Sequence, residues 1–305
     1  MLKGKKIGLV LGGGGARGLA HIGVLKVLEK NNIPIHMISG TSIGAVVGAF
    51  YSSEPNAKKL EKEALEMDWD NLFDYTISRS GIIKGKKIEE MLEKRLSDIK
   101  FKELKIPLYI TAFDVDNSQE VIFSKGDVSK AVRSSISIPG IFIPVENGGK
   151  ILVDGGVIDP LPIEILKKKK ADIIIVVNVD GTKEKPAIEG VAIDSKSKKK
   201  LPNVFKILQK TTFSVSNKIC NSQILEQGAD LVISPNLSKI STLDFSKPKK
   251  IIRKGEREAS KSIKRIRKIT EPNAFKDFLF ELKKELKEDI SDIKKELKGE
   301  KPILG

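Results

Sequence analysis

Apolar positions along the first fifty residues follow two different periods. The run at residues 7–11 is short, apolar and ended by glycines, which predicts a buried strand. Apolar side chains over residues 19–28 then recur at helical spacing until two asparagines stop the pattern. A second strand is predicted at residues 33–39 and a second helix at residues 43–51. This order, with its tight connections, predicts parallel βαβ units around a buried sheet.

Similar patterns continue to about residue 235. Further strands are predicted at residues 108–112, 120–124, 151–153, 173–179 and 231–233. Further helices are predicted at residues 54–67, 86–97, 128–134, 163–169 and 204–227. Residues 68–85 lack a regular period, and their aromatic side chains (Trp69, Phe73, Tyr75) suit a cover over a site. We predict an α/β domain over residues 1–245 and a charged helical extension over residues 246–305.

The extension contains one long amphipathic pattern. Apolar residues recur at steps of three and four from residue 274 to about residue 299, which predicts a helix. Its polar face mixes lysines with acidic residues in nearly equal numbers, whereas a helix lying in a membrane surface is more basic and aromatic. Packing on the domain or self-association as a helical pair is therefore predicted, with lipid contact as the alternative.

Composition limits the class of protein. A chain of 305 residues, 40% apolar and 31% charged, can bury a large core and is expected to be globular. Cys220 has no second cysteine to pair with and no adjacent histidine, so we expect it to be structural, in a reducing compartment such as the cytoplasm. The amino-terminal apolar run is too short for a signal peptide, and no run reaches the ~18 residues of a spanning helix.

The net charge of +15 is concentrated in one region. Residues 183–268 hold 21 Lys and Arg against 8 Asp and Glu. This region is interpreted as a solvated basic surface, with peripheral contact to an anionic membrane, at its inner surface, as the alternative. It lacks the interleaved aromatic residues and module signatures typical of nucleic-acid binding, so no nucleic-acid partner is predicted.

Two glycine motifs follow the first two predicted strands. The first, GGGGARG, places Gly13, Gly15 and Gly18 in the G-x-G-x-x-G spacing of a dinucleotide site. That site also needs an acidic residue at the end of the second strand, where this chain has none. A phosphate-binding P-loop needs Gly-Lys-Ser/Thr, which is also missing. Both nucleotide readings are therefore excluded.

The second motif, GTSIG, matches G-x-S-x-G between a predicted strand and helix. A serine in this context lies on a strained turn, beside the positive end of a helix. Ser42 is therefore the candidate nucleophile, and a close-packed loop serine is the alternative. The carboxyl ends of parallel strands open at one edge, so the amides of Gly13, Gly14 and Gly15, with a helix beginning near Gly18, can form an oxyanion hole facing Ser42.

Ser42 needs a base, and a serine–histidine–acid order is not available. The two histidines, His21 and His36, both precede Ser42; His21 is assigned to packing in the first helix, and His36 to the middle of the second strand. Asp154 is the best candidate, because it follows a short strand and precedes two glycines that allow a sharp turn. A dry pocket would raise its pKa toward the range of a useful base. The alternative is an ordinary turn aspartate.

Together these motifs resemble those of the patatin-like phospholipases. The residues that carry the resemblance are GGGARG (13–18), GTSIG (40–44) and DGG (154–156), supported by SSISIPGIFIPV (134–145) and IDPLP (158–162). The likeness covers roughly residues 5–234. It implies a three-layer α/β/α fold with a mostly parallel sheet, and hydrolysis of lipid acyl esters by a serine–aspartate dyad without a metal or other cofactor.

The resemblance also implies residue roles. Ser42 would be the nucleophile, Asp154 the base, and the amides of Gly14 and Gly15, with Gly13 as a further candidate, the oxyanion hole. Arg17 matches the family's basic position and would either bind a lipid phosphate or brace the loop. A phospholipase A or lysophospholipase is therefore expected. An acyltransferase, a non-lipid carboxylesterase and a lipid-binding protein with an idle dyad remain as alternatives.

Overall fold

A computed structural model describes residues 5–180 and 204–270 and is built around one mixed sheet. The strands are connected in the order β5, β6, β3, β2, β1, β7, β8, with β4 paired to β3. Their bounds are β1 Ile7–Leu11, β2 Met37–Thr41, β3 Leu108–Asp114, β4 Gln119–Phe123, β5 Val145–Asn147, β6 Lys150–Asp154, β7 Ile173–Val177 and β8 Leu231–Ile233. Strands β3, β2, β1, β7 and β8 are parallel to one another, while β4, β5 and β6 are joined by antiparallel pairs.

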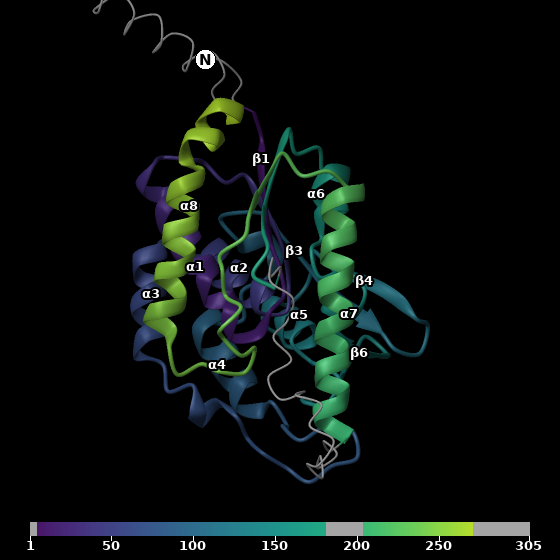
Figure 1. Cartoon of the computed structure of the whole chain (residues 1–305). Helices are drawn as coiled ribbons and strands as arrows, with labels where there is room; N and C mark the ends of the chain where they lie inside the picture. Colours follow the sequence, from purple (N-terminus) through teal and green to yellow (C-terminus); the bar gives the residue numbers. More distant parts are fainter. Residues whose placement is uncertain (1–4, 181–203, 271–305) are drawn as a thin grey trace, which may run out of the picture. The chain divides into compact units, whose positions relative to one another are not determined.

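Helices cover both faces of the sheet, as expected for a three-layer α/β/α fold (Figure 1). Their bounds are α1 Ala20–Lys30, α2 Ile43–Ser53, α3 Ala57–Glu66, α4 Lys86–Leu96, α5 Val128–Ser135, α6 Ile163–Lys168, α7 Val204–Glu226 and α8 Pro248–Thr270. Side chains of α6 and α7 form a core with Val10 and Val176 on one face. Helix α2 packs on the other face, where Gly48 lies against Leu11 and Ile38. None of the helices in the two described ranges is long and apolar enough to cross a membrane.

One edge of β3 receives two strands that meet end to end. Residues 110–114 of β3 pair with β4, so β2 and β6 must share the opposite edge. Thr41, at the end of β2, lies opposite Thr111, and Asp154, at the end of β6, lies opposite the next residue, Ala112. Because β6 is antiparallel to β3, the carboxyl ends of β2 and β6 point at each other. The residues at these two ends are therefore brought together.

Most predicted elements are confirmed, and the exceptions have local causes. The second strand begins at Met37 instead of residue 33, because Pro34 has no N–H to donate to the sheet. His36 therefore precedes the strand instead of lying inside it. Strand β5 was not predicted, although Asn147-Gly148-Gly149 is a hairpin signal and both glycines have positive φ. A 3-10 turn, η1 Gly15–Leu19, precedes α1 where one continuous helix from Gly18 was expected.

The first turns of α8 are fixed to α1 by contact between backbones. A Cβ added to Gly255 would lie 2.0 Å from the carbonyl oxygen of Ala20, and one added to Gly23 would lie 2.0 Å from that of Ile252. By contacts, the chain divides into units 1–263 and 264–305, of which the second is described only to residue 270. The predicted boundary at residue 245 stays a prediction. The predicted helix at 274–299 lies outside the described residues.

We expect Gly255→Ala to destabilise the protein by roughly 1–3 kcal/mol, because the added methyl group meets backbone that cannot move aside. Alanine would otherwise favour a helix, so a loss of stability isolates the clash. Urea unfolding monitored by circular dichroism measures it. Ser260→Ala, at an exposed position of the same helix, is the control and should change stability little. Equal stability of the two variants would contradict the close crossing of α1 and α8.

Candidate active site

Ser42 occupies the strained turn between β2 and α2. Its backbone has φ 57° and ψ −126°, a conformation that costs a non-glycine residue of order 1–3 kcal/mol. The Ser42 N–H donates to Oγ of Ser135 at 2.8 Å, and its side chain is buried. Neighbouring Thr41 is held by a 2.7 Å hydrogen bond between its Oγ1 and that of Thr111. These contacts hold the hydroxyl in one place at the carboxyl edge of the sheet.

Asp154 meets Ser42 directly. The Ser42 hydroxyl donates to Oδ2 of Asp154 at 2.5 Å, and the N–H of Gly156 donates to Oδ1 at 2.7 Å. Asp154 is only 4% exposed. Burial raises the pKa of Asp154 to about 7, and the two hydrogen bonds, which favour the charged form, only partly offset that rise. The carboxyl group can therefore gain or lose a proton near neutral pH.

The glycine loop offers two unengaged amides. The N–H of Gly13 donates to the carbonyl of Pro160 at 3.2 Å, and that of Ala16 donates to the carbonyl of Thr242 at 2.8 Å. For the N–H groups of Gly14 and Gly15, no acceptor is found among residues 5–180 and 204–270. The φ of 153° at Gly14 favours glycine, and a Cβ on Gly15 would lie 2.0 Å from the carbonyl oxygen of Thr242. The amide of Gly13 is thus already engaged, and an oxyanion hole formed by Gly14 and Gly15 stays a prediction.

Close backbone approach brings the two loops together. A Cβ on Gly44 would lie 2.0 Å from the carbonyl oxygen of Leu11, so α2 can pack onto the end of β1 only with glycine at that position. Gly13 lies beside the serine, since a Cβ built on it would be 3.6 Å from Cβ of Ser42. Glycine is also needed at position 155, because a Cβ there would lie 2.5 Å from Oγ1 of Thr111. The glycines around the serine therefore serve packing as well as hydrogen bonding.

The Arg17 side chain connects the glycine loop to the segments after β7 and β8. Its Nε donates to the carbonyl of Ile240 at 2.8 Å, and its guanidinium pairs with Asp180 at 2.6 Å. Both Arg17 and Asp180 are largely buried. Of the two predicted roles, this geometry favours bracing of the glycine loop over binding of a phosphate. Asp180 follows β7 at the carboxyl edge of the sheet. An acidic residue directly after a predicted parallel strand could have been recognised in the sequence as a neighbour of the glycine loop.

Neither histidine contacts the serine–aspartate pair. His21 is fully buried, and its Nε2 lies 2.8 Å from the carbonyl oxygen of Gly12. Burial lowers the pKa of His21 to about 4, so it is neutral at physiological pH. His36 accepts a hydrogen bond from the N–H of Ile7 through Nδ1 at 3.0 Å. Cys220 lies on the core-facing side of α7, and burial raises the pKa of its thiol, in agreement with a structural role.

Two supports of the site had no usable sequence signal. Ser135, which fixes the backbone of Ser42, lies in a segment that was noted only for its resemblance to the family. Thr242 contacts the glycine loop through its backbone carbonyl, which any residue type would offer.

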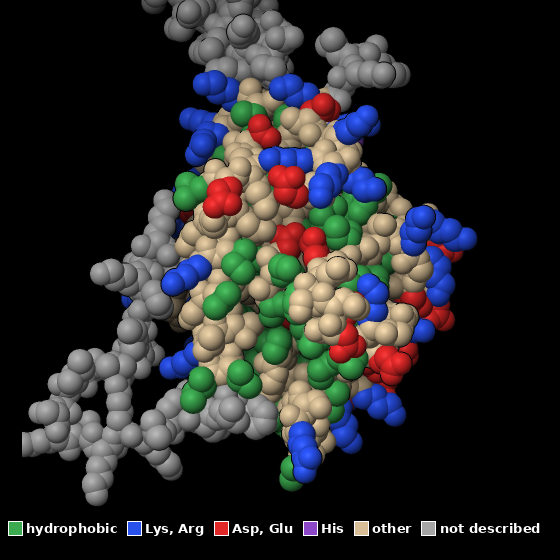
Figure 2. Space-filling view, turned by 90° about the vertical axis from the view of Figure 1, so that its right-hand side faces the viewer, with side chains coloured by type: hydrophobic (Ala, Val, Ile, Leu, Met, Phe, Trp, Pro, Cys, Tyr) green, Lys and Arg blue, Asp and Glu red, His purple; other side chains and the backbone are tan. Residues whose placement is uncertain are grey.

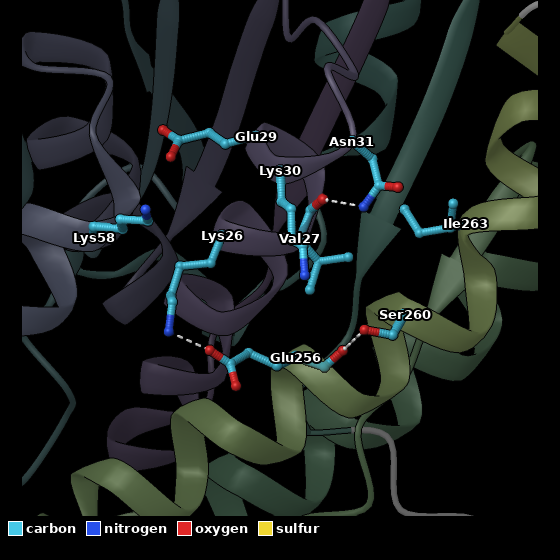
Figure 3. Close-up of a pocket in the computed structure, with 9 residues that line it drawn as sticks. All are labelled: Lys26, Val27, Glu29, Lys30, Asn31, Lys58, Glu256, Ser260 and Ile263. Atoms are coloured by element: carbon cyan, nitrogen blue, oxygen red, sulfur yellow. Dashed lines mark hydrogen bonds and ion pairs between the residues drawn. The ribbon is translucent and has the colours of Figure 1, made fainter.

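A large hollow exists elsewhere on the protein. It measures about 960 Å³ and is lined by the second half of α1 together with α3 and α8 (Figure 3). Lys26, which lines the hollow, forms ion pairs with Glu256 of the lining and with Glu61 of α3. Because α1 begins at the glycine loop and runs away from it, this hollow lies at the opposite end of the helix from Ser42. Its lining includes none of the candidate site residues.

Comparison with known proteins gives consistent results. The family model described as "Patatin-like phospholipase" matches residues 9–167, just over half of the chain. Lysophospholipase NTE1 of Eremothecium gossypii is 30% identical over 273 residues, which cover 84% of this chain and 18% of that protein. An uncharacterized NTE family protein of Mycobacterium tuberculosis is 36% identical over 188 residues, which cover 60% of this chain and 51% of that protein. The chain therefore spans from less than a fifth to about half of these relatives.

A solved structure shares the fold. VipD from Legionella pneumophila superimposes with a TM-score of 0.55 at 14% sequence identity, covering 85% of this chain and 66% of that one. At this identity the likeness concerns the arrangement of helices and strands, in agreement with the three layers described above.

We expect Asp154→Asn to be more stable than the wild type at pH 8, by up to roughly 4 kcal/mol, and to lose that advantage toward pH 4. The folded-state pKa of about 7 lies above the unfolded value near 4, so the folded wild type binds more protons between these limits. Wild-type stability therefore falls as pH rises from about 4 to about 7. Thermal unfolding at a series of pH values measures this. Asp116→Asn, at an exposed position, is the control. A stability difference that does not change with pH would contradict the burial cost.

Proposed function

Because the chain belongs to the patatin-like phospholipase family, we propose that it is a serine ester hydrolase acting on lipid acyl esters, of phospholipase A or lysophospholipase type. The observation that carries this proposal is the 2.5 Å hydrogen bond from the Ser42 hydroxyl to Asp154 inside the protein. The unengaged amides of Gly14 and Gly15, which follow Gly13 in the loop that lies beside Ser42, support it further. Hydrolysis needs a nucleophile, a base and an oxyanion hole, and these groups can fill all three roles.

In the first half of the proposed reaction, Ser42 Oγ attacks the ester carbonyl carbon while its proton passes to Oδ2 of Asp154. The carbonyl oxygen becomes negatively charged and is stabilised by the N–H groups of Gly14 and Gly15. The tetrahedral intermediate then breaks its bond to the alcohol oxygen, which takes the proton from Asp154 and leaves. An acyl group remains on Ser42. A carboxyl group with a pKa of about 7 suits both proton transfers.

In the second half, a water molecule replaces the alcohol. The water oxygen attacks the acyl carbon while Asp154 takes a proton from that water. The N–H groups of Gly14 and Gly15 stabilise the second oxyanion. Collapse of this intermediate releases the fatty acid and returns the proton to Ser42 Oγ. The N–H of Gly156 holds Asp154 in position through both halves, since it bonds to the oxygen that does not exchange protons.

The proposed partners follow from the same chemistry. A lipid or lysolipid is the proposed substrate, and peripheral contact with an anionic membrane surface is proposed as the way the protein reaches it. The relatives named lysophospholipase favour a substrate with one acyl chain. Self-association through residues 274–299 and a cytoplasmic location remain predictions.

The activity test uses Ser42→Ala and Asp154→Asn. A fluorophosphonate probe should label the wild type and not Ser42→Ala, and both variants should lose hydrolysis of a lysophospholipid by at least a thousand-fold. Ser53→Ala, at the last residue of α2 and so away from Ser42, is the control. Because Asp154 must be ionised to accept the proton, wild-type kcat/KM should rise about ten-fold per pH unit up to about pH 7 and then level off. Full activity of Asp154→Asn would contradict its role as base.

Arg17→Gln separates the two roles considered for Arg17. If Arg17 braces the glycine loop, kcat should fall by about 10- to 100-fold on both a phospholipid and an uncharged nitrophenyl ester, because the amides shift from their positions. If Arg17 binds a phosphate, the loss should appear in KM and only with the phospholipid. We expect the first result. Lys62→Gln, at an exposed position of α3, is the control for loss of one charge.

A further inference from the structure

The loop at residues 75–85 holds two apolar side chains in solvent. Tyr75 is 73% exposed and Ile77 is fully exposed, at 105% of its reference area. Single exposed apolar residues are ordinary on protein surfaces. This loop differs in its charge, because residues 75–87 contain four cations, all exposed, and no acidic residue. Those cations are Arg79, Lys84, Lys86 and Lys87.

The loop is anchored, so its exposed tip is a fixed feature. Asp74 accepts hydrogen bonds from the N–H groups of Gly85 and Lys86 at 2.7 and 2.9 Å, which closes the loop at its base. The N–H of Thr76 donates to the carbonyl of Ile82 at 2.9 Å and closes it again nearer the tip. Buried Arg133 binds the carbonyl of Lys84 from below. The fold therefore projects residues 77–80 outward.

A second group of cations lies on the exposed face of α8. Five side chains line a hollow of about 430 Å³, namely Lys249, Lys250, Arg253, Lys254 and Arg257. Within the described ranges, none of the five forms an ion pair with an acidic residue. The acidic residues nearby in the chain are already paired, Asp244 with Lys247 and Glu256 with Lys26. Burial, and then repulsion from neighbouring cations, lowers the pKa of Lys254.

Aromatic stacking joins the loop, α8 and the glycine loop. Phe245, three residues before α8, stacks on Trp69 with ring centres 4.7 Å apart and lies 5.9 Å from the ring of Phe73. Phe73 in turn lies 6.5 Å from the ring of Tyr75. The same connecting segment touches the glycine loop, since the carbonyl of Thr242 accepts from Ala16. The loop, the glycine loop and the start of α8 therefore lie at the carboxyl end of the sheet, which is the lower end in Figure 1, and the rest of α8 runs toward the other end.

We propose that this end of the protein docks on an anionic lipid surface, with the tip at residues 75–79 entering the interface and the cations of α8 and residues 79–87 contacting headgroups. This inference rests on the proposed function, because it brings the site to aggregated lipid substrate. Figure 2 shows hydrophobic and basic side chains together at the lower end of the face it presents. An apolar anchor beside cations is the combination that binds anionic interfaces. A protein partner would not require both features next to the segment that contacts the glycine loop.

The test measures binding of the full chain to vesicles by co-sedimentation. Every protein carries Ser42→Ala, so that lipid is not consumed, and vesicles contain phosphatidylcholine with or without phosphatidylglycerol. Lys249→Gln/Lys250→Gln/Arg253→Gln should weaken binding to the anionic vesicles on the order of a hundred-fold, at about five-fold per cation. Ile77→Ser should weaken vesicle binding about ten-fold, and by the same factor with and without phosphatidylglycerol. High salt should weaken the contribution of the cations to binding and leave the contribution of Ile77 unchanged.

The matched control removes three lysines at the other end of the sheet, as Lys167→Gln/Lys168→Gln/Lys170→Gln. These residues directly precede β7 and so lie at the amino end of the sheet. The control should bind as the parent does. Equal loss in both triple variants would indicate net charge alone and overturn the docking face. Unchanged binding of the α8 triple variant would also overturn the docking face. So would a result in which the variants change the oligomeric state, measured by light scattering, and do not change vesicle binding.

Failure of the proposed function would look different. Turnover of a water-soluble nitrophenyl ester by protein with Ser42 intact reports the chemistry without any membrane. If that turnover is absent while vesicle binding still depends on α8 and Ile77, the hydrolase assignment fails and the docking face stands. Far-ultraviolet circular dichroism of each variant confirms that it is folded.

Discussion

The candidate site depends on the shared edge of β3, where β2 and β6 arrive from opposite directions. Because both strands end there, Ser42 and Asp154 lie next to each other although neither strand pairs with the other. The contact is buried, so the carboxyl group loses water and its pKa rises to about 7. A hydroxyl and a carboxyl group thus form a pair that can exchange a proton near neutral pH, without a histidine between them.

The glycines make this arrangement possible in two ways. Some permit close packing, as where Gly44 of α2 lies against the backbone of β1 and Gly255 of α8 lies against α1. Others adopt conformations that turn amides away from secondary structure, so that Gly14 and Gly15 keep donors available while Gly13 and Ala16 hold the loop in place. The oxyanion hole that we propose therefore depends on a backbone whose other donors are already occupied.

The surroundings of the site are connected to it by a few contacts. The segment before α8 contacts the glycine loop through the carbonyl of Thr242, accepts a hydrogen bond from Arg17 at Ile240 and stacks through Phe245 on Trp69. The predicted cover at residues 68–85 is thus linked to the site through the chain that leads into α8. A membrane bound by the proposed docking face would contact the same segments that support the glycine loop.

The sequence by itself determined most helices and strands, the candidate nucleophile and base, and the exclusion of a nucleotide site. These follow from local periodicity and from the chemistry of neighbouring residues. Only the tertiary structure decided that Ser42 and Asp154 touch, that Gly13 is already engaged, and that Arg17 pairs with Asp180. The partners in the two side-chain contacts are 112 and 163 positions apart, and no local pattern encodes which distant strand end will share an edge with which.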